Sequence, residues 1–190
     1  MRLKWLGMVG VVCLLASSIL AHAQAGEGTL SDAEVESLRD AAYVPVDRIA
    51  EFEKILDKRE KQIDALIAKR WYPGRADDLH NLMEQMAGIA DELSDNLDEY
   101  DKNHRDIRKA LPKLVLATER WSTSLRAPAD DGVYNVERKL ALDAVKDIRE
   151  ETEQMETEQT AYFKAHPEAE KAEKERTAHP HATTAGDGPG

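Results

Sequence analysis

Apolar side chains recur at intervals of three and four residues over most of this chain, and this spacing constrains its fold more than any other feature. Such spacing places them on one face of an α-helix, whereas a half-buried strand needs strict alternation. A first stretch contains Ile49, Phe52, Leu56, Arg59, Ile63 and Leu66, and a second contains Leu79, Leu82, Met86, Ile89, Leu93, Asn96, Tyr100, Asn103, Ile107, Ala110, Leu114, Ala117 and Trp121. The sequence therefore predicts an all-α protein.

Capping and turn residues divide this pattern into long helical segments. Ser31 and Glu34 have the spacing of a capping box, which predicts a helix start. Pro45 predicts a kink or a restart soon afterwards, because proline interrupts helical hydrogen bonding. Pro73-Gly74 and the segment 128–132, which contains Pro128 and Gly132, each predict a reversal of the chain. Three long helices result.

The second of these helices is predicted to run from about residue 76 to about residue 126, because the alternation of three- and four-residue intervals continues without interruption over this range. Its weak points are the polar segment that begins at Tyr100 and the proline at position 112. We expect an elongated antiparallel bundle of three long helices, ~60–75 Å long at about 1.5 Å per residue. A break between Tyr100 and Pro112 would give four helices instead.

A third helix is predicted to follow the second reversal. Its core face is expected to contain Val133, Val136, Leu140, Ala144, Ile148, Met155 and Tyr162. Beyond Arg149 the sequence consists mostly of Glu, Gln and Thr, so we expect thin packing there. His166-Pro167 predicts a break before a short charged helix.

The chain begins with the three parts of a secretory signal peptide. Residues 1–4 are basic, residues 5–16 are mainly apolar, and Ala21-His22-Ala23 is an A-x-A cleavage site, with cleavage after Ala25 as the alternative. The apolar run is shorter than the ~20 residues of a spanning helix, which favours cleavage over an uncleaved anchor. We predict a bacterial protein exported to the periplasm or the extracellular space, with no membrane insertion after cleavage.

Cleavage changes the chemistry of the chain that remains. It removes Cys13, the only cysteine, and two basic residues, which makes the net charge of −11 more negative by two. An acidic chain argues against nucleic acid or an anionic membrane as a partner, because both attract basic surfaces. We expect a flexible lead-in (24–30), a single helical domain (31–165) and a charged, then disordered tail (166–190).

Two Asp-x-x-His pairs are candidate metal ligands. Asp77 with His80, and Asp101 with His104, each share a helix face at a spacing of three residues. On one continuous helix the two pairs would lie ~36 Å apart, so they could not share a metal ion. We predict that these four residues are surface residues and that the protein has no metal ion or other cofactor.

No sequence motif supports catalysis. Ser122 and Ser124 lack the Gly-x-Ser-x-Gly elbow that would expose a nucleophile, and the chain has neither a His-Glu-x-x-His motif nor a phosphate-binding glycine loop. The acidic residues between Asp91 and Asp101 are expected to form a solvated face. We therefore predict that the protein is not an enzyme.

Three aromatic residues lie near the predicted reversals and are candidate partner contacts. Trp71 and Tyr72 lie at the first reversal and Trp121 near the second. Each could anchor another protein, or close the core at an end of the bundle. Arg59 stands at a core position, where a polar residue sets helix register or extends its charged end to the surface.

These observations predict a non-catalytic helical protein of the cell envelope that acts through protein contacts, with another protein or by self-association. The polar third helix supports this, because thin packing beyond Arg149 would leave part of the bundle for another chain. A periplasmic holdase-type chaperone or stress protein is the alternative. The composition is similar to that of small periplasmic helical chaperones, although the Leu-Thr-x-x-Gln signature of the Spy type is absent. A metal-binding helical protein is the least favoured hypothesis.

Overall fold

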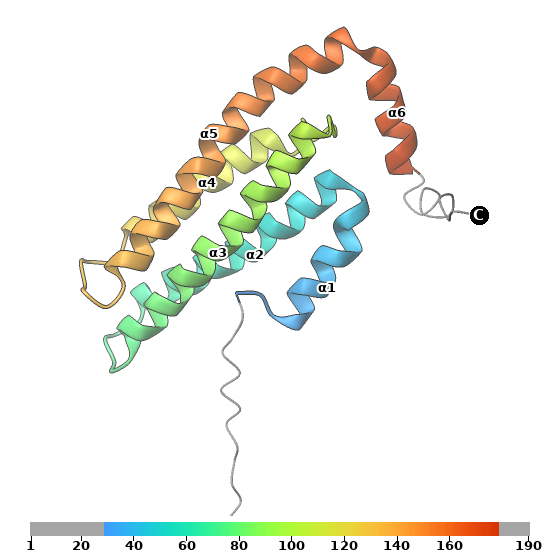
Figure 1. Cartoon of the computed structure of the whole chain (residues 1–190). Coiled ribbons are helices and arrows are strands. Elements are labelled where there is room, and N and C mark those ends of the chain that lie inside the picture. Colours follow the sequence, from blue (N-terminus) through green and yellow to red (C-terminus); the bar gives the residue numbers. More distant parts are fainter. Residues whose placement is uncertain (1–28, 179–190) are drawn as a thin grey trace, which may run out of the picture.

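The computed structural model describes residues 29–178, and these form an all-helical protein without strands (Figure 1). The fold class predicted from the spacing is therefore confirmed. The predicted signal peptide, most of the lead-in and the tail from residue 179 lie outside the described residues. The elements in chain order are α1 (Asp32–Asp40), the 3-10 helix η1 (Ala41–Tyr43), α2 (Pro45–Ala68), α3 (Arg75–Lys102), α4 (Leu111–Arg126), α5 (Asn135–Ala165) and α6 (Pro167–Ala178).

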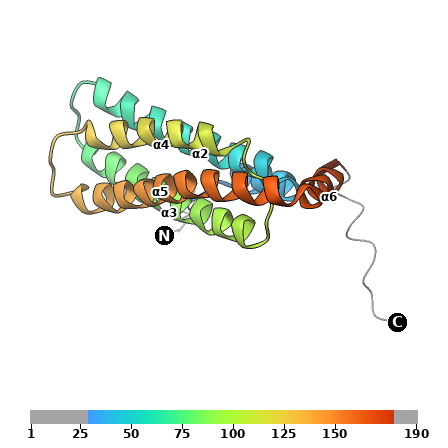
Figure 2. The ribbon, with the colours of Figure 1, turned by 90° about the horizontal axis from the view of Figure 1, so that it is seen from above.

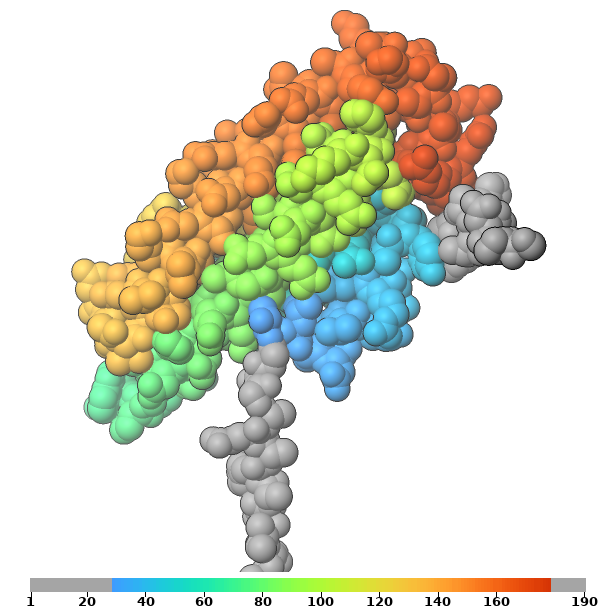
Figure 3. Space-filling model, viewed as in Figure 1, coloured from blue at the N-terminus to red at the C-terminus, as the bar shows by residue number. Residues whose placement is uncertain are grey.

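Four long helices, α2 to α5, pack side by side around one core (Figure 2). α2 packs against α3 and α4, and α5 packs most extensively against the same two helices. The chain reverses direction at each connection between these four helices (Figure 1). The short helix α1 lies beside α2 and α3, and α6 folds back from the end of α5 (Figure 3). Within residues 29–178, no helix has the length and hydrophobicity that crossing a bilayer demands.

The predicted continuous helix over residues 76–126 is wrong, because the chain leaves the helix after Lys102 and re-enters it at Leu111. His104 adopts a left-handed conformation with φ of 49°. Its N–H donates to the Asp101 carbonyl at 3.0 Å, and the Arg105 N–H donates to the Tyr100 carbonyl at 2.8 Å. This is the Schellman pattern that ends helices, here with histidine where glycine is usual.

Within residues 29–178 the expectation of three long helices is therefore corrected to six α-helices, of which four, α2 to α5, are long. The break lies between Tyr100 and Pro112, as the four-helix alternative expected, and α1 and α6 are additional short helices. The longest helix, α5, has 31 residues and is about 46 Å long at 1.5 Å per residue. The four long helices are thus shorter than the predicted 60–75 Å rod requires.

Burial continues across the break even though the helix does not. Ile107 in the connection is fully buried, and its N–H donates to the side-chain oxygen of buried Gln159 at 3.2 Å. Pro112 then lies in the first turn of α4, where its missing N–H costs no hydrogen bond. In this segment the apolar spacing predicted the burial of Ile107, Ala110 and Leu114 but did not predict that the backbone before them leaves the helix.

The predicted start of the first helix and the restart at Pro45 are both confirmed. Ser31 and Glu34 form a reciprocal capping box, in which the Ser31 N–H donates to the Glu34 carboxylate at 2.9 Å and the Glu34 N–H donates to the Ser31 hydroxyl at 3.4 Å. Pro45 is in the first turn of α2. Proline is tolerated there because the first helical N–H groups have no partner within the helix.

The core face predicted for the third helix is wrong at its start and at its end. Val133, Val136 and Leu140 are exposed, and Tyr162 is only half-buried. The buried face of α5 contains Ala141, Ala144, Val145, Ile148, Thr152, Met155, Gln159 and Phe163. Four of these residues lie beyond position 149, so the expected thin packing there is also wrong.

The charged helix predicted after His166-Pro167 is present as α6, and ionic contacts hold it in place. Glu173 is buried and accepts from Arg105 Nε at 2.7 Å and from Arg176 Nη1 at 2.8 Å. Arg108 lies 3.6 Å from Glu170. α6 therefore covers the end of the bundle with carboxylates paired to arginines.

Candidate functional site

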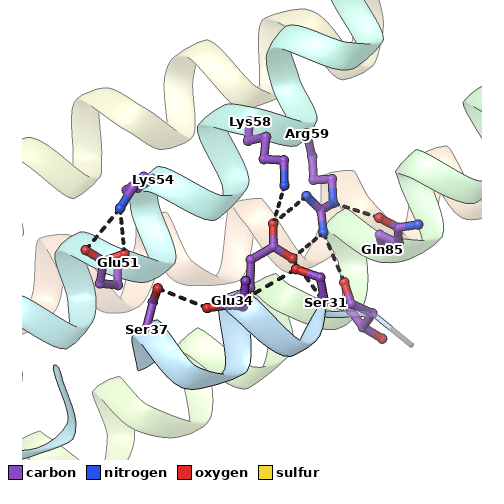
Figure 4. Close-up of polar contacts among 10 residues, drawn as sticks. Ser31, Glu34, Ser37, Glu51, Lys54, Lys58, Arg59 and Gln85 are labelled. Atoms are coloured by element: carbon purple, nitrogen blue, oxygen red, sulfur yellow. Dashed lines mark hydrogen bonds and ion pairs between the residues drawn. The ribbon is translucent and has the colours of Figure 1, made fainter. Parts of the chain in front are cut away.

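A buried ionic network joins α1 to α2 and α3 (Figure 4). The guanidinium of Arg59 donates to both carboxylate oxygens of Glu34, at 2.9 and 2.8 Å. Its Nε donates to the side-chain oxygen of Gln85 at 2.7 Å, and Lys58 donates to Glu34 at 2.7 Å. Arg59 is 5% exposed and Glu34 is 8% exposed. The bidentate pair therefore fixes α1 on the bundle.

The same pairing stabilises the charged form of Glu34. The Arg59 guanidinium holds the pKa of Glu34 well below its ordinary value, so the carboxyl group is ionised near neutral pH. The sequence identified Arg59 as a polar residue at a core position. It did not identify Glu34 as the partner, because the two residues are joined only when α1 folds back on α2.

The structure does not assemble either candidate metal pair into a ligand set. His80 Nδ1 lies 2.9 Å from the Val133 carbonyl oxygen and 3.1 Å from Glu137, while Asp77 is exposed. His104 lies beyond the end of α3, so it no longer shares a helix face with Asp101. Its ring stacks on Tyr162 instead, with centroids 4.1 Å apart. No group of three or more His, Cys, Asp or Glu side chains suited to a metal ion occurs within residues 29–178.

The three aromatic candidates lie in different environments. Trp121 is fully buried, and its indole N–H donates to Asp57 at 2.8 Å, so it belongs to the core and offers no surface for a partner. Tyr72 is half-buried, and its hydroxyl donates to Asp78 at 2.5 Å, which raises the pKa of Tyr72. Trp71 is 74% exposed. Only Trp71 therefore keeps most of its side chain available for contact.

The α2–α3 and α4–α5 loops lie at the same end of the bundle (Figures 1 and 2). Three further apolar side chains are exposed in the α4–α5 loop and the first turns of α5. Val133 is 45% exposed, Val136 is 64% exposed and Leu140 is 55% exposed. The positions 133, 136 and 140 share one face of α5 and the turn before it. We call these three residues together with Trp71 the end surface.

Hydrogen bonds hold the α4–α5 loop that carries this surface. The Val133 N–H donates to the Asp131 carboxylate at 2.9 Å, and the Asp131 N–H donates to the Asn135 side chain at 3.0 Å. Arg138 donates to the Pro128 carbonyl at 2.9 Å. The turn of the other loop uses Gly74, whose φ of 91° suits glycine. Local hydrogen bonds thus fix the α4–α5 loop.

Two grooves lie between the long helices, and their lining residues do not form a recognisable catalytic group. One of about 330 Å³ lies between α2 and α3, and one of about 520 Å³ lies between α2 and α4. Glu60 lines the second groove, where burial raises its pKa. Its near neighbours include Arg120 and Ser124. Among the residues that line this groove, Ser124 has no histidine beside it to activate its hydroxyl.

Comparison with known proteins does not assign this chain to a family. No family model, no curated protein and no solved structure matches this chain.

Proposed function

We propose that this chain is a non-catalytic, exported helical protein of the cell envelope that acts by binding another protein through the end surface. One observation carries the proposal. Val133, Val136 and Leu140 have the spacing of core residues, yet they lie exposed beside a loop that hydrogen bonds hold in place. The export part of the proposal rests on the predicted signal peptide.

General properties of interfaces support this choice of surface. Clustered exposed apolar side chains mark sites of protein contact, and tryptophan is enriched among the residues that dominate binding energy. Surfaces held by local hydrogen bonds lose little conformational freedom on binding, which favours affinity. Where the apolar spacing of a sequence and the observed burial disagree, a functional surface is a common reason.

Site-specific photocrosslinking in the native host tests this proposal. A photoreactive phenylalanine analogue at position 71 or 136 should form one discrete adduct with the same protein. The matched control is position 116, because Leu116 is 59% exposed on α4 and is not part of the end surface. We expect that analogue to give no such adduct, since a specific interface excludes distant surfaces.

Competition separates binding at this surface from incidental proximity. Purified wild-type protein should abolish the adduct, whereas a variant carrying Trp71→Ser and Leu140→Ser should not compete. Equal adducts from positions 71, 136 and 116 would contradict the proposal. Many different adducts from every position would favour the holdase-type chaperone instead.

A further inference from the structure

A separate pocket of about 400 Å³ lies between α1, α2 and α3. This volume falls within the range of about 300–1,000 Å³ that is typical of small-molecule sites. The Glu34–Arg59 pair fixes α1, so the pocket wall is in place before any ligand arrives. The lining residues are Leu30, Val35, Leu38, Arg39, Ala42, Arg48 and Glu92.

Arg48 is the unusual member of this lining. Its Nε atom is buried and has no hydrogen-bond partner. Within the described part of the chain its side chain forms no hydrogen bond or ion pair, and its contact is with the ring of Phe52, 5.8 Å from the guanidinium carbon. Arg48 as a whole is half-buried, but buried donors are almost always paired, so its Nε is available to an acceptor that is not part of the described fold.

The other charges of the pocket define which acceptor fits. Arg39 is paired with Glu36 on the exposed side of α1. Glu92, on α3, forms no ion pair with Arg48 within 4.0 Å and adds one negative charge to the wall. Among the described residues that line this pocket, Arg48 is thus the cation without an ion-pair partner, and Leu30, Val35 and Leu38 give the wall an aliphatic part.

We propose that this pocket binds a small amphiphilic anion, with a carboxylate on the Arg48 guanidinium and an aliphatic chain along α1. A guanidinium matches a carboxylate through two parallel N–H donors, and such charge-assisted bonds are the strong ones. The aliphatic wall contributes by removing the chain of the ligand from water. This inference is independent of the end surface, which lies at the opposite ends of α2 and α3.

Calorimetric titration of the purified protein with octanoate tests the proposal. We expect octanoate to bind, and octanol and octylamine to bind at least about tenfold more weakly, because neither offers a carboxylate to the guanidinium. Arg48→Gln should weaken octanoate binding by about tenfold or more. Glu92→Gln should strengthen it, because a like charge leaves the wall.

Two further variants keep the test decisive if Arg48→Gln impairs folding. Val35 is 40% exposed, so Val35→Asp should fold normally and weaken octanoate binding through repulsion at the pocket mouth. Arg149→Gln, on α5, is the matched control and should bind octanoate like the wild type. The proposal is overturned if octanoate does not bind, if octanol binds as tightly, or if Arg48→Gln and Val35→Asp both bind like the wild type.

Discussion

Replacing Arg59 with alanine should destabilise the protein by about 3–5 kcal/mol, because the change leaves the buried carboxylate of Glu34 without its bidentate partner. The side-chain oxygen of Gln85 loses its donor in the same change. Single domains have total stabilities of about 5–15 kcal/mol, so this loss is a large fraction of the whole. Urea denaturation followed by circular dichroism measures it.

Lys58→Ala is the matched control for Arg59→Ala. Lys58 donates to the same carboxylate, but its side chain is 56% exposed, and exposed ion pairs contribute about 0–1 kcal/mol. Its removal should therefore change the free energy of unfolding by less than about 1 kcal/mol. Equal losses for the two variants would show that burial of the Arg59–Glu34 pair is not what fixes α1.

The same pair gives stability a defined pH dependence. The pKa of Glu34 is lowered in the folded protein, so its contribution is fully present above the ordinary value of 4.5 and declines as the pH falls below it. The wild type should therefore lose stability on acidification from about pH 6 to about pH 3, and Arg59→Ala should lose less over the same range. A wild type and a variant with parallel pH profiles would contradict this assignment.

Trp121→Ala is expected to cost about 3–5 kcal/mol, the usual range when a fully buried large aromatic side chain is truncated. The indole fills space in the core on α4, and its N–H satisfies Asp57 on α2. Both contributions disappear together in the alanine variant. Thermal and urea unfolding of the purified variant provide the measurement.

Trp121→Phe separates the two contributions. It keeps most of the buried ring but removes the hydrogen bond to the Asp57 carboxylate, and a hydrogen bond to a charged group contributes about 1.5–3 kcal/mol. Arg120 still contacts Asp57 at 2.9 Å in that variant, so the carboxylate keeps one partner. If Trp121→Ala unfolded at the same urea concentration as the wild type, the placement of this indole in the core would be wrong.

Much of the fold could be predicted because the apolar spacing reports burial. Ile49, Phe52 and Leu56 in the first stretch, and Leu93 and Trp121 in the second, are all buried as expected. The capping box and the proline restart involve neighbouring residues, whose geometry is set locally.

The sequence-based predictions were wrong where an unusual backbone conformation or a contact with a distant helix determines the structure. The sequence has no glycine to signal the end of α3, since His104 is the residue that adopts the left-handed conformation there. Val136 and Leu140 looked like core residues, but Ala141 and Val145 occupy the buried face of α5 and rotate those two outward. The Arg59 partner and the Arg48 pocket both depend on α1 folding back, which no local pattern reports.

Cysteine labelling tests the proposed contact most directly, because the only cysteine of the chain lies in the predicted signal peptide. Leu140→Cys reports on the end surface and Leu116→Cys is its equally exposed control. A maleimide should label Leu140→Cys in intact native cells at least about tenfold more slowly than in the purified protein, since a bound partner covers an interface core. Leu116→Cys should react equally fast in both settings. Equal labelling of Leu140→Cys in cells and in purified form would contradict the account.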